Sequence, residues 1–224
     1  MDISAFDRRP DPDDARVRLA DATRHVITEL ASSTASSDEF ERARDLVEQA
    51  VAVLAERGHG RSYDAAEASL ADQAASGAFL DNSPFIGRVN PLAAPIEVSY
   101  DTGDAGCPKV VGRATFGAAY EGPPGCVHGG FIAGGFDEVL GVAQSMSGQP
   151  GMTGRLEVSY RSPTPLHREV RYEGWIDRVE GRKIFAVATL HHGDVLCAEA
   201  TGLFISMKPE VFQRLMSTRA QPAD

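Results

Sequence analysis

The sequence predicts an α+β fold in which one curved antiparallel sheet wraps around a single long apolar helix. In the second half of the chain, two strand patterns are followed by one apolar helix and then by four more strands. The helix, about residues 130–146, combines bulky apolar side chains with Ala and Gly and leaves almost no polar face. Such a helix needs cover on most sides, and a sheet wrapped around it provides that cover.

The strand predictions rest on alternating apolar and polar residues and on the turn signals between them. The alternation is clearest in Ile96-Val98-Tyr100 and in Leu156-Val158-Tyr160. The expected strands cover about residues 96–100, 109–120, 153–160, 170–179, 183–191 and 195–206. The last two are apolar on both faces, which is typical of strands in the middle of a sheet that is covered on both sides.

Two helices are expected before the sheet. The first, about Asp13–Ser32, has Val17, Ala20, Ile27, Leu30 and Ala31 roughly on one face. The second runs from Ser37 or Asp38 to Arg57, with Phe40, Ala43, Val47, Ala50 and Leu54 at helical spacing. Asp38 is the expected N-cap, with Glu41 three residues later, and Gly58-His-Gly60 is the expected stop.

These patterns divide the chain into three parts. Residues 1–94 form an N-terminal helical extension with a loop-rich connection at 59–94, a short helix near 65–75 and a loose start at 1–10. Residues 95–208 form the sheet-and-helix domain. Residues 209–224 form a tail with one helical turn near 211–216.

Composition and charge restrict the function. The 224 residues are 42% apolar and carry a formal net charge of −10, which argues against binding to nucleic acid or to an anionic membrane. No apolar run of about 18 residues and no apolar signal core is present, so we expect a cytoplasmic protein without a membrane segment. The three cysteines are odd in number and lack metal-like spacing, so neither a disulfide framework nor a metal site is expected.

The chemistry concentrates in residues 122–141. Gly129 and Gly130 follow a histidine and open the apolar helix. A helix N-terminus presents unpaired N–H groups and the positive end of the dipole, which suits a developing oxyanion. A glycine pair can also serve only to allow tight packing of the loop.

Asp137 lies within the apolar helix, where an unpaired buried charge would be costly. It follows Gly129 by eight residues, or about 12 Å along a helix, so the two cannot act on one carbonyl carbon within the same chain. If they cooperate, two helices must pack antiparallel about a two-fold axis, which predicts a dimer with two shared sites. Glu138 points about 100° away and is expected to be a solvated or paired carboxylate.

Two further side chains accompany this pair. His128 directly precedes the helix and is expected to cap it or to bond a loop carbonyl. Thr153 begins the strand after the helix, where its hydroxyl could orient a water molecule or the carboxylate. The chain has no G-x-S-x-G elbow, no GKS/GKT phosphate loop and no G-x-G-x-x-G after a strand, and we expect no cofactor.

The run His128-Gly-Gly…Asp137 after Gly-Pro-Pro-Gly resembles the hotdog-fold acyl-CoA thioesterases, in particular their PaaI-like branch. The segment Met-Thr-Gly-Arg-Leu-Glu-Val-Ser-Tyr from Met152 is similar to that family's strand after the helix. The resemblance covers about residues 95–207 and implies a hotdog fold and hydrolysis of an acyl-CoA thioester.

The resemblance also implies roles for individual residues. The Gly129 N–H would polarise the thioester carbonyl, and Asp137 of the partner subunit would act as nucleophile or as general base on water. Thr153 would position that water or carboxylate, and His128 would support the loop or the carbonyl. The expected substrate contacts are Gly130, Arg161 and Ser162, and the candidates for the CoA phosphates are Arg161, Arg168, Arg182 and Lys183.

Gly122 departs from the family pattern, in which many members have an asparagine or similar amide at this position. The missing amide and the long N-terminal extension leave open a non-catalytic hotdog module that binds acyl-CoA or a lipid-like ligand. A hotdog dehydratase is a third and weaker interpretation, because it needs a catalytic His and Asp paired on one helix segment and the sequence does not contain such a pair. A homodimer or a dimer of dimers is expected, and the sequence does not indicate which acyl group is bound.

Overall fold

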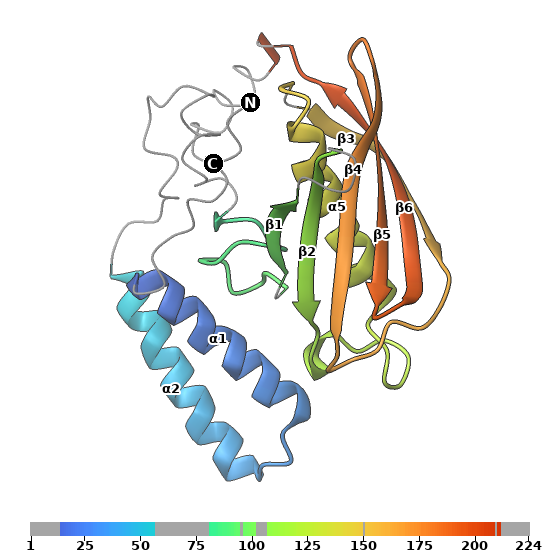
Figure 1. Ribbon diagram of the computed structural model, residues 1–224. Helices are drawn as coiled ribbons and strands as arrows, with labels where there is room; N and C mark the ends of the chain where they lie inside the picture. The colour runs from blue at the N-terminus through green and yellow to red at the C-terminus, as the bar shows by residue number, and fades with distance from the viewer. Residues whose placement is uncertain are drawn as a thin grey trace.

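Six antiparallel strands form one curved sheet around helix α5 (Gly129–Ser145), and this confirms the predicted α+β hotdog fold (Figure 1). The computed structural model describes residues 14–56, 81–94, 96–101, 107–149, 151–208 and 210–211. The strands are β1 Glu97–Asp101, β2 Lys109–Thr115, β3 Gly151–Tyr160, β4 Glu169–Glu180, β5 Lys183–His192 and β6 Val195–Ser206. Their order in the sheet is β1-β2-β4-β5-β6-β3, so β1 and β3 form its two edges.

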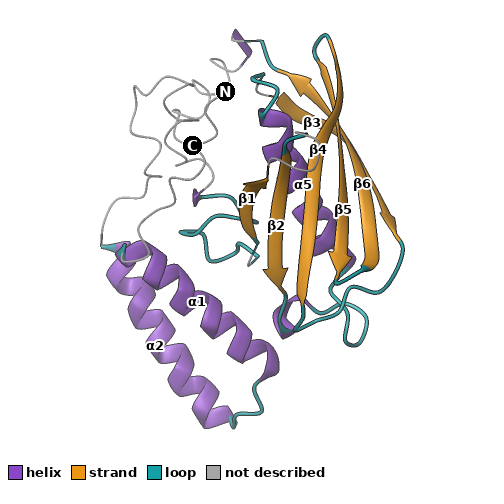
Figure 2. Cartoon of the chain, in the orientation of Figure 1, coloured by secondary structure: helices purple, strands orange, loops and turns teal. Residues whose placement is uncertain are grey.

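The core lies between α5 and the concave face of the sheet (Figure 2). From the helix, Phe136, Val139 and Leu140 are completely buried. From the sheet, alternate residues point at them, as Ile184 and Leu190 of β5 do. Each such side chain contributes about 1.5–3 kcal/mol relative to an exposed one, so this single helix–sheet contact provides much of the stability.

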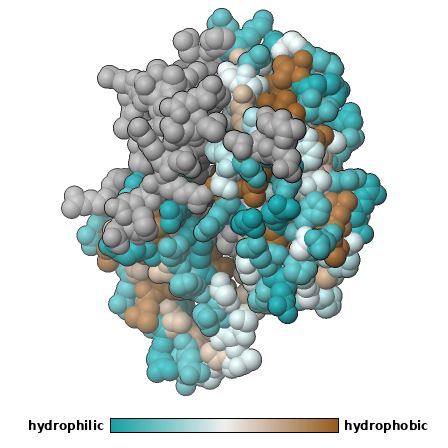
Figure 3. Space-filling model, in the orientation of Figure 1, coloured by the Kyte–Doolittle hydropathy of each residue, from teal (hydrophilic) through white to brown (hydrophobic). Residues whose placement is uncertain are grey.

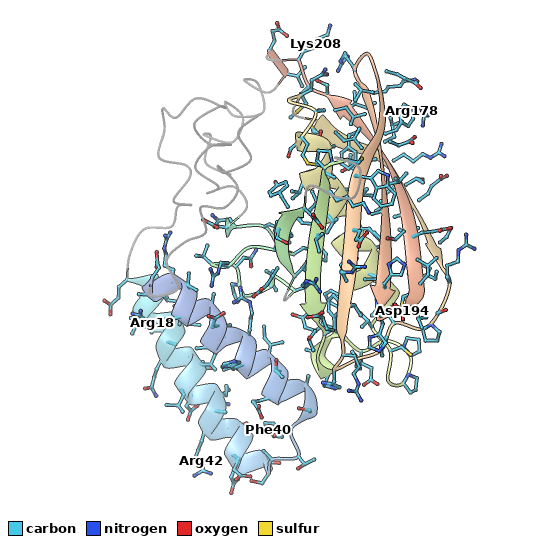
Figure 4. All side chains as sticks on the ribbon, viewed as in Figure 1. Arg18, Phe40, Arg42, Arg178, Asp194 and Lys208 are labelled. Atoms are coloured by element: carbon cyan, nitrogen blue, oxygen red, sulfur yellow. The ribbon has the colours of Figure 1, made fainter. Side chains whose placement is uncertain are left out.

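The convex face of the sheet is only partly covered. As predicted, β5 and β6 lie in the middle of the sheet, but Phe185 and Val187 on the outer side are half-buried rather than buried. The Arg178 guanidinium lies 3.7 Å above the Phe185 ring and projects from the upper part of the sheet in Figure 4. Long polar side chains therefore supply part of the cover that was expected on this face.

The end of β2 and the start of α5 differ from the prediction for reasons that the structure shows. The strand expected over 109–120 ends at Thr115, because residues Ala118–Tyr120 form a short 3₁₀ helix, η4, whose Tyr120 N–H donates to the Gly117 carbonyl over 3.0 Å. Helix α5 begins one residue before the predicted start, because His128 caps it.

The N-terminal helices α1 (Ala15–Ser32) and α2 (Ser37–Ala55) run in opposite directions and lie away from the sheet in the view of Figure 1. The predicted cap of α2 is wrong: the N-cap is Ser36, not Asp38. The Glu39 carboxylate, and not Glu41, reaches back to accept a 2.8 Å hydrogen bond from the Ser36 N–H. Ser36 has the extended backbone that an N-cap requires, and the capping box therefore lies two residues earlier than expected.

The apolar faces of these helices are less buried than their periodicity indicates. On α1, Val17 and Ala20 are buried, but Leu30 is 65% exposed. On α2 no residue is buried, and Phe40, labelled in Figure 4, lies on its exposed apolar face. Figure 3 shows hydrophobic side chains gathered at the surface of this helical pair. Helical periodicity predicted the helices correctly but not what they pack against.

Several predictions fall outside the described residues. These are the loose start at 1–10, the helix near 65–75, the stop at 58–60 and most of the helical turn at 211–216. The three cysteines are all described and all free. None of the described helices combines the length and apolar character that crossing a membrane requires.

Gly135 tests the contact between α5 and the sheet. A methyl group at this position would lie 2.6 Å from Tyr172 Oη and 3.1 Å from Ile96 Cδ1. We expect Gly135→Ala to lower the free energy of unfolding by about 1–3 kcal/mol, because overpacking outweighs the gain in helix propensity. Denaturant unfolding measures this, with Gly117→Ala as the control, since the nearest atom to a methyl there is 4.0 Å away. Unchanged or increased stability of Gly135→Ala would contradict the packing described.

Candidate active site

His128 shapes the N-terminus of α5. Its Nδ1 accepts a hydrogen bond of 3.0 Å from the Gly130 N–H, and its own backbone is extended, as an N-cap requires. The predicted capping role is therefore confirmed. Because Nδ1 accepts this bond, it carries no proton in this arrangement. The Gly130 N–H already donates to His128 and is therefore not free for a substrate. Because Gly130 has no side chain, a substrate can still approach its backbone closely.

Gly129 keeps a free donor at the same place. Within the described part of the chain, its N–H finds no acceptor, while its carbonyl accepts a 2.8 Å hydrogen bond from Tyr160 Oη. Tyr160 was predicted only as an alternating strand residue, and this contact was missed. It is 53% exposed at the end of the edge strand β3, and no local sequence pattern indicated the contact, because its two partners are 31 residues apart.

Asp137 and Thr153 are in direct contact. The Thr153 hydroxyl donates to Asp137 Oδ1 over 2.9 Å, which joins the middle of α5 to the edge strand β3. Of the two partners suggested for this hydroxyl, the structure selects the carboxylate. Both side chains are exposed in the single chain, so Asp137 lies at the surface of α5 and not among its buried apolar residues.

Glu138 faces a different direction, as predicted, and is a paired carboxylate. It is half-buried and hydrogen-bonded to Ser83, from the segment before β1. Burial raises the pKa of Glu138, and the neighbouring Asp137 charge raises it further, while the Ser83 hydrogen bond opposes both effects.

The glycine at position 122 has a local structural reason. A methyl group there would lie 2.8 Å from His128 Cα and 3.1 Å from His128 Cβ. The Gly122 N–H also donates to the Cys126 carbonyl over 2.9 Å, which closes the loop before the helix. This loop therefore has no room for the amide side chain that the family pattern suggests.

The predicted substrate-binding residues fall at two ends of the sheet. Arg161 and Ser162 follow Tyr160 and so lie near the start of α5. The Arg161 guanidinium pairs with Glu199, with Nε 3.1 Å from the carboxylate. Arg182 lies at the opposite end of the strands, where Nε and Nη2 donate to the Ser206 carbonyl, and Lys183 is next to it. Within one chain, only the first group could bind a ligand that also touches Gly129.

The chemical content of the site is therefore one free backbone donor at a helix N-terminus and one exposed carboxylate held by a hydroxyl. Among the described residues, no group of three or more His, Cys, Asp or Glu side chains could hold a metal ion.

This fold and these residues can now be compared with known proteins. A crystal structure of a thioesterase superfamily protein superposes with a TM-score of 0.70 at 31% sequence identity, over 87% of this chain and 96% of the other. The chain belongs to the thioesterase superfamily. The family model of this superfamily matches residues 124–200, which include the loop before α5, the helix and Thr153.

Curated relatives of this superfamily member include acyl-coenzyme A thioesterases. It is 38% identical over 95 residues to acyl-coenzyme A thioesterase THEM4 of Xenopus laevis, a match over 42% of this chain and 43% of that protein. It is also 38% identical over 96 residues to THEM4 of Bos taurus, a match over 42% of this chain and 39% of that protein. The alignments thus span about two fifths of the length of these relatives.

Glu138 provides a test of the electrostatics beside the site. Its raised pKa means that the native state holds this proton more tightly than the unfolded chain, in which the ordinary value is 4.5. The free energy of unfolding therefore falls as the pH rises from about 4.5 through the raised pKa. We expect Glu138→Gln to raise Tm at pH 7, by roughly 2–4 °C for each kcal/mol of relieved penalty, and to have little effect at pH 4.

Thermal unfolding at the two pH values measures this difference, with Glu97→Gln on an exposed edge-strand position as the control. The same Tm change for Glu138→Gln at both pH values would contradict a titration effect.

Proposed function

We propose that this thioesterase superfamily member hydrolyses acyl-CoA thioesters. The observation that carries the proposal is the exposed Asp137 carboxylate, held by the Thr153 hydroxyl at 2.9 Å on the helix whose N-terminus offers the free Gly129 N–H. The similarity of the sheet-and-helix region to acyl-coenzyme A thioesterases supports the choice of substrate class.

The proposal requires two copies of the chain. Gly129 and Asp137 lie about 12 Å apart along α5, too far for one reacting carbon. The exposed face of α5 carries Gly130, Asp137 and Gly141, and a methyl group at position 141 would meet nothing within 4 Å. The edge strand β3 lies beside this face, with unpaired backbone groups along one side. A two-fold axis here would place each Asp137 near the partner's Gly129.

In the shared site, the thioester carbonyl oxygen would accept the Gly129 N–H of one subunit. The Asp137 carboxylate of the other would either take a proton from water or attack the carbonyl carbon itself. With water as the nucleophile, its oxygen bonds to the carbon and the carbonyl oxygen becomes an oxyanion that the Gly129 N–H stabilises. When the carbonyl re-forms, the C–S bond breaks, and the CoA thiolate takes up the proton that Asp137 removed from water. The products are the free acid and the CoA thiol. Thr153 would hold the carboxylate oriented for this step.

The CoA portion would extend from the start of α5. Arg161 and Ser162 lie at that end of the sheet and, with the backbone of Gly130, are the contacts we propose for it. Arg168 directly precedes β4 at the same end and is an additional candidate for the phosphates. The proposed working form is a cytoplasmic homodimer or dimer of dimers from the PaaI-like branch.

Removing either half of the site should abolish turnover. We expect Asp137→Asn to lower kcat for acyl-CoA hydrolysis by about 10²-fold or more. Gly129→Pro should lower it by about 10²–10³-fold, because proline removes the N–H but fits the first turn of a helix, and His128 already has the extended backbone that proline requires before it.

Release of free thiol from a panel of acyl-CoAs measures both variants. Gly129→Ala is the matched control, because it adds a side chain and keeps the N–H, and should retain much more activity than Gly129→Pro. Equal rates for wild type and Asp137→Asn would contradict the proposal. Tight acyl-CoA binding without turnover by the wild type would instead support the non-catalytic binding module.

Mixed oligomers test the sharing of sites between subunits. In a heterodimer of Gly129→Pro and Asp137→Asn chains, one of the two sites regains both intact groups only if each site combines two subunits. Random mixing should then restore about a quarter of wild-type activity, because half of the dimers are mixed and half of their sites are intact. Co-expression with two different affinity tags isolates these heterodimers. Activity no higher than in either parent would place both groups of a site in one chain.

A further inference from the structure

The segment 81–94, which precedes the sheet, packs against α5 beside Asp137. The tip of the Phe85 ring points at the helix backbone: a methyl group at Gly134 would overlap Cζ and Cε1 of the ring and lie 2.8 Å from Cε2. Residues three apart on a helix are surface neighbours about 5–6 Å apart, so the ring lies within one helical turn of Asp137.

Three sets of contacts hold Phe85 in this place. The Ser83 hydroxyl accepts from the Phe85 N–H over 3.0 Å and from the Ile86 N–H over 3.2 Å, which fixes the turn. Ser83 also bonds Glu138 on α5. On the other side, Arg24 of α1 donates through Nη2 to the carbonyls of residues 87, 88 and 90 at 2.9–3.0 Å. The ring is therefore mounted on a fixed segment rather than on a free loop.

The exposed face of α5 that carries Gly130, Asp137 and Gly141 is called the open strip. The segment 81–94 borders this strip and does not cover it. At 100° per residue, Gly130 and Asp137 project within about 20° of each other. Gly134 lies about 40° and Glu138 about 80° to one side of Gly130. Phe85 and Ser83 cover this side, while Asp137 remains exposed. An acyl group bound against the open strip would meet the Phe85 ring at its flank.

We propose that Phe85 is the wall that limits the acyl group, and so determines which acyl-CoAs are accepted; this rests on the proposed function. Glycine is a weaker helix former than alanine, and the glycine at position 134 is what allows the ring to touch the backbone beside the carboxylate. The ring is only half-buried, so part of its apolar surface remains available to a ligand. The ligand surface it offers is apolar and aromatic, which suits a hydrocarbon or aryl acyl group.

Phe85→Ala tests the wall. The probes are straight-chain acyl-CoAs from four to sixteen carbons and phenylacetyl-CoA, together with their non-hydrolysable thioether analogues. We expect the variant to favour longer acyl groups, with the ratio of kcat/KM for the longest to the shortest substrate rising about tenfold or more. Leu92→Ala is the matched control, because Leu92 belongs to the same segment and is 70% exposed. It should leave the ratio unchanged.

The outcomes separate this inference from the proposed function. If the wild type hydrolyses acyl-CoAs and Phe85→Ala keeps the same chain-length profile, the wall is overturned and the thioesterase stands. If the wild type hydrolyses none, the proposed thioesterase activity is overturned, and the role of Phe85 is tested by the dissociation constants of the thioether analogues. A chain-length dependence that changes in Phe85→Ala supports that role, and an unchanged dependence overturns it. If Phe85→Ala does not fold, Phe85→Leu takes its place with the same two results.

Discussion

The packing of one helix into the concave face of one sheet is the contact on which the rest of the structure depends. Phe136, Val139 and Leu140 fill the space between α5 and the strands without remaining exposure. Because the sheet encloses only part of the helix, the opposite side of α5 must be left to something else. That open side carries Asp137, so the contact that stabilises the fold also determines where the reactive carboxylate lies.

The glycines of α5 follow from the same constraint. Gly135 faces the sheet, where Tyr172 leaves no room for a methyl group, and Gly134 faces the segment 81–94, where the Phe85 ring takes that space. At Gly141, by contrast, a methyl group would meet no atom of this chain within 4 Å. A helix this rich in glycine is weak by itself, and it persists because packing on several sides compensates for its low propensity.

Local patterns in the sequence predicted the strands, the apolar helix and the histidine cap, because these depend on neighbours along the chain. The Asp137–Thr153 contact was also within reach, since both residues belong to one recognisable pattern. Two other contacts, of Tyr160 with Gly129 and of Ser83 with Glu138, could not be predicted in this way, because each joins segments more than thirty residues apart. Periodicity likewise predicted the α2 helix but not its exposed apolar face, since it gives no information about a packing partner.

The N-terminal extension is connected to the site by a short chain of contacts rather than attached as a separate appendage. Arg24 on α1 holds three carbonyls of the segment before β1, and Ser83 and Phe85 of that segment contact α5 at Glu138 and Gly134. Each step is a direct hydrogen bond or van der Waals contact, so α1 helps to fix the position of the segment that borders Asp137. A sheet-and-helix domain without this extension would leave that flank open. If Phe85 limits the acyl group as proposed, the extension belongs to the substrate side of the molecule and helps to determine which acyl groups the sheet-and-helix domain accepts.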